Sequence, residues 1–222
     1  MHAIIISKLL PGLLISYLFG SIPTAYLFGK IARGIDLRQH GSGNLGATNA
    51  FRVLGKGIGT AVLSIDIFKG TAAVLAASFF FYSHNTAISR YLYVCLAAIT
   101  AVAGHNWTIF LGFKGGKGIA TSLGTLIAFS VIIPGFIKVV LIIIFMWLLT
   151  FLSTGFVSLA SVICSISLPG FAIIFNLPKE ITAFLLILAI FSVIKHKSNI
   201  SRLLQKKENR FNTRSFLKKL SK

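Results

Sequence analysis

The stretch GFIKVVLIIIFMWLLTFL, residues 135–152, holds a single charged side chain, that of Lys138, among long apolar ones. A helix that crosses the hydrocarbon core of a bilayer needs roughly 20 consecutive, mostly apolar residues, with about 17–25 the usual range. This stretch falls within that range and predicts a membrane helix. The number of such stretches then decides whether the protein crosses the membrane once or several times.

Apolar runs of similar character recur along the chain. They are bounded by charged residues, glycine or proline, at about residues 4–29, 57–82, 89–111, 119–133, 135–152, 155–176 and 180–194. The runs 119–133 and 180–194 are short, and they need flanking residues or a tilt to cross the membrane. Hydropathy alone allows about five to seven spans, and we expect about seven.

The composition agrees with a membrane protein. The 222 residues are 55% hydrophobic and 12% charged, whereas soluble domains carry roughly 25% charged residues. Open strands cannot cross lipid, and the runs lack the alternation that a barrel needs. We therefore expect an all-α fold, a polytopic membrane helical bundle, as one integral-membrane domain over residues 1–222. Met1–Phe28 lacks the basic start and the cleavage site of a signal peptide, so we expect it to be a retained first span.

The net charge of +18 is placed asymmetrically about these spans. With the N-terminus outside, the inside set is Lys30, Arg33, Arg38, Arg52, Lys56, Lys114, Lys117 and the basic residues from Lys195 onward. The outside set is Lys8, Arg90, Lys138 and Lys179. Cytoplasmic loops carry the excess of Lys and Arg, so we expect a cytoplasmic C-terminus and no nucleic-acid partner. The basic tail, about 196–222, fits contact with anionic membrane lipids, and its residues 209–222 fit an orientation signal equally well.

Two glycine-rich loops interrupt the apolar chain on the predicted cytoplasmic side. The first is GSGNLGATN, residues 41–49, with Arg52 just beyond it. It offers hydroxyl, amide and guanidinium groups in Ser42, Asn44, Asn49 and Arg52. Phosphate groups are bound by converging backbone N–H groups together with a forked arginine. The loop therefore predicts a phosphate site, although a polar turn between two spans has the same composition.

The second loop is GFKGGKG, residues 112–118, which precedes an apolar run. Amides at the start of the following helix and the Lys117 ammonium are able to face one anion there, with Gly115, Gly116 and Gly118 allowing close approach. The loop does not match the nucleotide-binding pattern Gly-x4-Gly-Lys-Ser/Thr, which disfavours nucleotide hydrolysis. We expect a site for a phosphorylated substrate.

Few other residues suit chemistry. Asp66 and Lys69 are spaced to pair on one helix face, which favours a structural role. His105 fits either a base or a hydrogen-bonding residue at the membrane interface. Further polar groups recur at helical spacing, in the pair Ser158 and Ser161 and in the trio His196, Asn199 and Arg202. No acids are spaced as a catalytic pair or metal cluster, so we expect neither metal nor cofactor. The His-x4-Asp acyltransferase signature is absent.

These segments together resemble the bacterial acyl-phosphate:glycerol-3-phosphate acyltransferase family (PlsY). The matching stretches, in family order, are GSIPTAY, DLRQHGSGNLGATNAFRVLGK, DIFKG, GHNWTIFLGFKGGKGIATSLG, VSLAS and HKSNISRLL. The resemblance implies a seven-helix bacterial inner-membrane enzyme with its motifs on the cytoplasmic side. It implies transfer of a fatty acyl group from acyl phosphate to the 1-position of glycerol 3-phosphate, giving lysophosphatidic acid and phosphate. A separate soluble enzyme would supply the acyl phosphate.

The resemblance also implies where the site lies. Its predicted catalytic residues are Ser42, Arg52, Lys117, His196 and Asn199. Its predicted substrate-binding residues are Asn44, Asn49, Gly115, Gly116, Gly118, Ser158 and Ser161. The chain departs from the family pattern at Lys195, where arginine is common, and at Trp107-Thr108, where a proline is usual.

The chemistry of acyl phosphate fits such a site. It is a mixed anhydride with a good leaving group, so binding of two phosphates and alignment of the reactants can supply much of the rate. The base is either His196 or an oxygen of the substrate phosphate, and we expect the latter because no carboxylate is placed to orient a histidine. Which loop holds which phosphate stays open. A transporter for a phosphorylated metabolite is the competing class.

Overall fold

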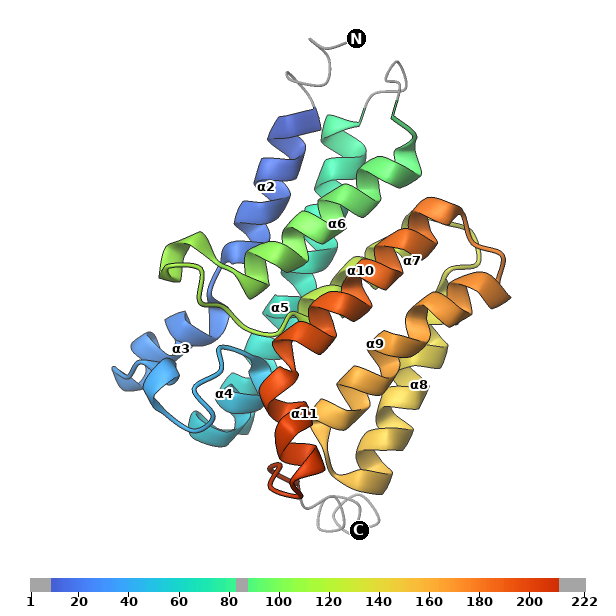
Figure 1. Cartoon of the computed structure of the whole chain (residues 1–222). Coiled ribbons are helices and arrows are strands. Elements are labelled where there is room, and N and C mark those ends of the chain that lie inside the picture. The colour runs from blue at the N-terminus through green and yellow to red at the C-terminus, as the bar shows by residue number, and fades with distance from the viewer. Residues whose placement is uncertain (1–8, 83–87, 212–222) are drawn as a thin grey trace.

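The computed structural model describes residues 9–82 and 88–211, and within them the chain is helical with no strand. The helices are α2 (Leu10–Ser21), α3 (Thr24–Arg33), η2 (Leu37–Gln39), α4 (Ala47–Val53), α5 (Lys56–Ala76), η3 (Ala77–Phe81), α6 (Arg90–Asn106), η4 (Ile109–Leu111), α7 (Ile119–Ile132), α8 (Ile137–Thr154), α9 (Val157–Ile174), α10 (Lys179–Lys195) and α11 (Lys197–Leu204) (Figure 1). The predicted all-α fold is confirmed. The ends of the predicted first span and basic tail, residues 1–8 and 212–222, lie outside the described residues.

Each predicted apolar run contains at least one helix. Among the described residues, five segments are long and apolar enough to cross a membrane: Leu10–Arg33, Lys56–Phe79, Arg90–Leu111, Ile137–Thr154 and Val157–Ile174. A sixth is obtained if α10 and α11, which meet at a 62° bend, count as one span. The apolar helix α7 has 14 residues, and at 1.5 Å per residue it is about 21 Å long, against about 30 Å of hydrocarbon. The seventh span therefore stays a prediction.

Apolar side chains cover the outer face of α8 as expected for contact with lipid. Leu141, Phe145 and Leu149 are 58%, 65% and 58% exposed, and their spacing of four residues puts them on one face of the helix. In a soluble protein, a continuous exposed stripe of this kind would be a contact or aggregation surface. Here it gives the bundle an apolar exterior.

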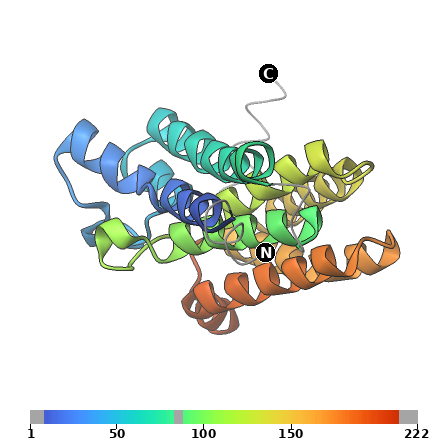
Figure 2. The ribbon, with the colours of Figure 1, turned by 90° about the horizontal axis from the view of Figure 1, so that it is seen from above.

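Glycines let two pairs of helices pack closely. A Cβ atom on Gly70 of α5 would lie 2.2 Å from the Thr121 carbonyl oxygen of α7, and one on Gly124 would lie 2.0 Å from that of Ile67. Gly20 of α2 and Gly104 of α6 likewise have no room for a Cβ atom, because each lies against the backbone of the other's helix. Since lipid provides no hydrophobic drive between helices, such backbone contact is a main source of association. Seen from above, α5 and α10 lie on opposite sides of the bundle (Figure 2).

The first apolar run contains a break that hydropathy does not reveal. Helix α2 ends at Ser21, and α3 begins at Thr24 after Ile22 and Pro23. Proline has no N–H group to continue the hydrogen-bond ladder, so the helix is interrupted there. Helix α3 then leads to the first glycine-rich loop.

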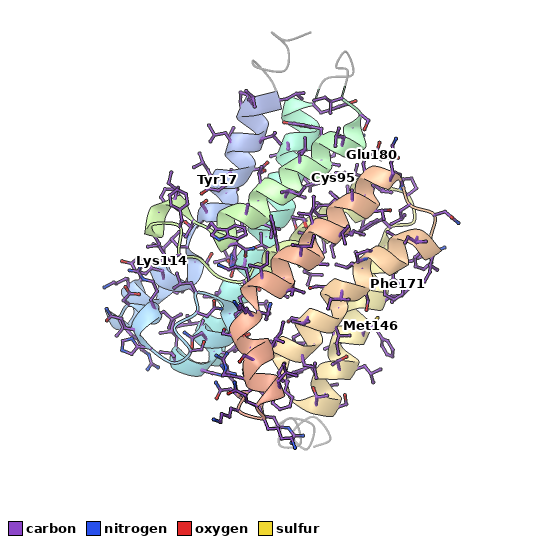
Figure 3. The ribbon with its side chains drawn as sticks, viewed as in Figure 1. Tyr17, Cys95, Lys114, Met146, Phe171 and Glu180 are labelled. Atoms are coloured by element: carbon purple, nitrogen blue, oxygen red, sulfur yellow. The ribbon has the colours of Figure 1, made fainter. Side chains whose placement is uncertain are left out.

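The two glycine-rich loops and the start of the basic tail lie at one end of the bundle. Helices α3, α4 and α11 lie together at the end opposite the start of α2 (Figure 1). Lys114, in the second glycine-rich loop, lies toward this end, whereas Glu180 lies at the far end of α10 (Figure 3). Both loops and the start of the basic tail therefore share one side of the bundle, as the charge distribution predicts.

Candidate active site

The first glycine-rich loop joins η2 to α4 and is shaped by Asn49. Gly41 and Gly43 have φ angles of +63° and +71°, the left-handed region that glycine adopts without strain. The Asn49 carboxamide oxygen accepts a hydrogen bond from the Ser42 N–H at 2.9 Å, and its nitrogen donates to the His40 carbonyl at 3.0 Å. Asn49 is 1% exposed, so in this structure its amide holds the loop while Ser42 stands at the exposed edge.

The second glycine-rich loop folds back against the end of α6 and against the first loop. The Gly115 and Gly116 N–H groups donate to the carbonyl oxygens of Asn106 at 3.2 Å and His105 at 3.0 Å. A Cβ atom on Gly116 would lie 2.2 Å from the His105 Nε2 atom and 2.9 Å from the Leu45 carbonyl oxygen. Gly116 thus fills the narrow space where the two loops meet, and only a residue without a side chain fits there.

Lys117 connects this loop to α11. Its Nζ atom donates a hydrogen bond to the Asn199 Oδ1 atom. Burial lowers the pKa of Lys117 to about 8, and the nearby cations Arg202, Arg52 and Lys195 act in the same direction, while the Glu208 carboxylate opposes them. A fraction of the Lys117 side chains is therefore neutral near pH 8, and a bound phosphate would favour the charged form.

Glu208 is the acceptor that ties three groups together. Its Oε1 atom accepts hydrogen bonds from Asn199 at 2.6 Å and from Ser158 at 2.9 Å. Its Oε2 atom accepts one from the Arg202 Nε atom at 2.7 Å. Burial alone would raise the pKa of Glu208, but the hydrogen bonds from Asn199, Arg202 and Ser158 bring it below its ordinary value. A charged carboxylate thus joins α9 to α11 beside Lys117.

The segment after α11 contacts the connection between α8 and α9. The Phe211 N–H donates to the Gly155 carbonyl at 2.9 Å, and the Arg210 Nε atom donates to the Thr154 carbonyl at 2.8 Å. The Arg52 guanidinium carbon lies 4.9 Å from the centre of the Phe211 ring. A guanidinium over an aromatic face is a favourable cation–π arrangement. This contact brings α4, and with it the first loop, to the same cluster.

His196 lies at the bend between α10 and α11, three residues before Asn199. It is 3% exposed, and its Nδ1 atom is 2.8 Å from the Ser192 carbonyl oxygen. Because a carbonyl can only accept, Nδ1 carries the proton in the neutral ring and Nε2 has the free lone pair. The orienting partner is a carbonyl and not the carboxylate of a catalytic triad.

The structure brings four of the predicted site residues together, namely Arg52, Lys117, Ser158 and Asn199. Lys117 and Asn199 bond directly, Ser158 joins them through Glu208, and Arg52 lies close enough to lower the pKa of Lys117. Ser161 instead donates to the Val157 carbonyl at 2.8 Å and accepts from the Trp147 indole at 3.2 Å. Their individual roles in binding and catalysis stay predictions.

Glu208 and Lys195 belong to the cluster but are not among the site residues that the sequence predicts. Glu208 follows the predicted helical face, but its spacing from Asn199 is not helical, because α11 ends at Leu204. Lys195 donates to the Asn106 carbonyl at 2.8 Å, and its Nζ atom lies 5.3 Å from the centre of the Trp107 ring. Within residues 9–82 and 88–211, no three His, Cys, Asp or Glu side chains are grouped to hold a metal ion.

Comparison with known proteins agrees with this geometry. The family model described as "Glycerol-3-phosphate acyltransferase" matches residues 10–206. The chain belongs to the glycerol-3-phosphate acyltransferase family. The curated acyltransferase of Streptococcus sanguinis is 43% identical to it over 89% of this chain and 89% of its own length. That of Fusobacterium nucleatum is 38% identical over 90% of this chain and 96% of its own length.

Two crystal structures of a member of this acyltransferase family have the same fold. Both are of PlsY (YgiH), an integral membrane glycerol 3-phosphate acyltransferase. Its glycerol 3-phosphate form superposes with a TM-score of 0.81 at 36% identity, covering 94% of this chain and 98% of that one. Its lysophosphatidic acid form gives 0.78 at 35% identity, covering 92% and 96%. The predicted family and the helical membrane fold are confirmed.

Proposed function

We propose that this chain transfers a fatty acyl group from acyl phosphate to the 1-position of glycerol 3-phosphate, giving lysophosphatidic acid and inorganic phosphate. The observation that carries the proposal is the cluster around Lys117. Arg52, Lys195 and Arg202 lie close enough to influence its charge, and Glu208 is the acid among them. An excess of cations beside two glycine-rich loops suits two phosphorylated substrates.

The reaction needs little from the protein beyond binding and alignment. The 1-hydroxyl oxygen attacks the acyl carbonyl carbon, a C–O ester bond forms, and the C–O bond to phosphate breaks. Negative charge moves from the carbonyl oxygen to the leaving phosphate. Lys117 and Arg52 are suited to stabilise that charge, since fixed cations in a water-poor site act more strongly than in solution. Holding both reactants in line supplies a further large part of the rate.

The hydroxyl proton has two possible acceptors, and we infer that a phosphate oxygen of the substrate takes it. His196 has a free lone pair on Nε2, but its Nδ1 partner is the uncharged Ser192 carbonyl. Such a carbonyl fixes the ring without stabilising an imidazolium as a carboxylate does. The leaving phosphate is the better acceptor because it gains negative charge during the reaction.

We place the enzyme in a bacterial inner membrane with its site facing the cytoplasm. The site end of the bundle holds Lys30, Arg33, Lys56 and Lys114 as well as the cluster around Lys117, and cytoplasmic segments carry such an excess of basic residues. Acyl phosphate hydrolyses readily, so a soluble enzyme that forms it would deliver it at that face. Neither metal nor cofactor enters the proposed reaction.

The test uses purified protein in detergent with labelled glycerol 3-phosphate. Palmitoyl phosphate and palmitoyl-CoA are supplied side by side as donors. We expect labelled lysophosphatidic acid with palmitoyl phosphate as the donor and none with palmitoyl-CoA. Because detergent leaves no closed compartment, product formation also excludes a pure transporter. Product from neither donor would overturn the proposal, and product from palmitoyl-CoA alone would overturn the donor assignment.

A further inference from the structure

Directly beneath the two glycine-rich loops lies a buried ion pair that the proposed reaction does not use. The Lys69 Nζ atom is 2.8 Å from the Asp66 Oδ1 atom, and the side chains are 3% and 1% exposed. Taking two charges out of water is expensive, and apolar residues of similar size often stabilise a fold as well. The other contacts of this pair indicate what else it does.

The pair holds the break that leads into the first loop. The Lys69 ammonium donates to the Ile22 carbonyl at 2.8 Å, and the Thr24 hydroxyl donates to Asp66 Oδ1 at 3.0 Å. Ile22 and Thr24 flank Pro23, where the chain changes from α2 to α3. The direction of α3, and hence the starting point of the first loop, depends on these two hydrogen bonds.

The same pair reaches the second loop through His105. The His105 Nδ1 atom is 3.7 Å from Asp66 Oδ1, and the His105 carbonyl accepts the Gly116 N–H at 3.0 Å. The other ring nitrogen faces Gly116 so closely that a Cβ atom there would lie 2.2 Å from it. A small cavity at this point is lined by residues of both loops together with Lys69 and His105.

We propose that Asp66, Lys69 and His105 are positioning residues for acyl transfer, which set the spacing between the two glycine-rich loops. This inference rests on the proposed function. The three side chains act through the α2–α3 break and through Gly116, and they do not touch the reacting atoms. Since about 1 Å of misplacement can cost about 100-fold in rate, a unit that fixes both loops matters even without substrate contact.

The first test separates positioning from charge balance with the double variant Asp66→Asn/Lys69→Met. It removes both charges together, so no uncompensated charge stays buried. The control is Thr71→Val on the same helix, which removes the 2.9 Å hydrogen bond to the Gly124 carbonyl of α7 and touches neither loop. For each protein, kcat, the KM of each substrate and the melting temperature are measured in detergent.

We expect the double variant to melt near the wild type while its kcat falls at least about 10-fold with little change in KM. Thr71→Val should lower the melting temperature and leave kcat unchanged. A double variant with wild-type kcat would overturn the proposal, because the pair would then only balance its own charges. A fall in kcat for Thr71→Val matching that of the double variant would overturn it too.

A second test uses binding alone and stays informative if the double variant fails to fold. Calorimetry measures glycerol 3-phosphate binding to the wild type, Gly116→Ala, His105→Ala and the combination. If His105 positions Gly116, Gly116→Ala should weaken glycerol 3-phosphate binding less in the His105→Ala background than in the wild type. The two losses of affinity should differ about threefold or more. Additive effects would overturn the positioning role. These binding outcomes test the positioning role and leave the proposed function untouched. The proposed function itself is contradicted if the wild type forms no lysophosphatidic acid.

Discussion

Raising the pH from 7 to 9 should weaken the binding of one of the two phosphorylated substrates through Lys117. Burial lowers the pKa of this lysine to about 8, with Arg202, Arg52 and Lys195 contributing in the same direction. An ordinary lysine has a pKa of about 10.4 and stays charged throughout this range. The perturbation therefore acts on Lys117 long before it acts on exposed lysines.

The size and sign of the effect follow from the two protonation states. A bound phosphate favours the charged ammonium, so affinity is full below the pKa of the free site and is lost as the pH rises through it. With a pKa of about 8, the charged fraction falls from about nine-tenths at pH 7 to about one-tenth at pH 9. The dissociation constant should therefore rise about 10-fold.

Calorimetry in detergent measures this effect with glycerol 3-phosphate and, separately, with a non-hydrolysable acyl phosphonate. The second ionisation of a phosphate monoester lies near pH 6, so glycerol 3-phosphate itself changes little above pH 7. Lys117→Arg is the control, because its guanidinium stays charged over the whole range. The ligand whose affinity falls near pH 8 in the wild type is the one whose phosphate Lys117 binds. If both ligands bind with constant affinity, or if Lys117→Arg shows the same fall, the reasoning is wrong.

Three further predictions concern single side chains. His196→Ala should keep measurable turnover if the substrate phosphate takes the proton; complete loss of turnover with intact glycerol 3-phosphate binding would instead assign the base to His196. Glu208→Gln replaces the charged acceptor of Arg202 and should lower the unfolding free energy by about 1.5–3 kcal/mol in denaturant titrations, whereas an unchanged midpoint would deny it a structural role. Gly124→Ala puts a Cβ atom 2.0 Å from the Ile67 carbonyl oxygen and should destabilise by about 1–3 kcal/mol. Gly170→Ala, with open space around it, should not, and equal melting temperatures would contradict this packing.

The apolar runs predicted the helices well because hydropathy is a local property. The run at 135–152 became α8 (Ile137–Thr154) and the run at 155–176 became α9 (Val157–Ile174). The break at Pro23 was missed, because a single proline within an apolar run does not change the hydropathy average. Its position is stabilised by Lys69, which is distant in the sequence.

The site was predicted less completely, because its contacts join distant segments. The motif resemblance placed Lys117 and Asn199 in one site, and the structure bonds them directly. It gave no sign that Glu208 accepts from both Asn199 and Ser158. That contact depends on the segment after α11, which Phe211 and Arg210 hold through hydrogen bonds to the Gly155 and Thr154 carbonyls at the connection between α8 and α9. Asn49, which the sequence predicts to bind substrate, holds the loop backbone in the structure, and its role in binding stays a prediction.

Simultaneous measurement of lysophosphatidic acid and inorganic phosphate tests the central claim most directly. Purified wild-type protein in detergent receives palmitoyl phosphate and glycerol 3-phosphate, and Lys117→Met is run beside it. We predict one phosphate released for each lysophosphatidic acid formed, with both rates falling together in the variant. Phosphate released without lysophosphatidic acid, or undiminished product from Lys117→Met, would contradict acyl transfer at this site.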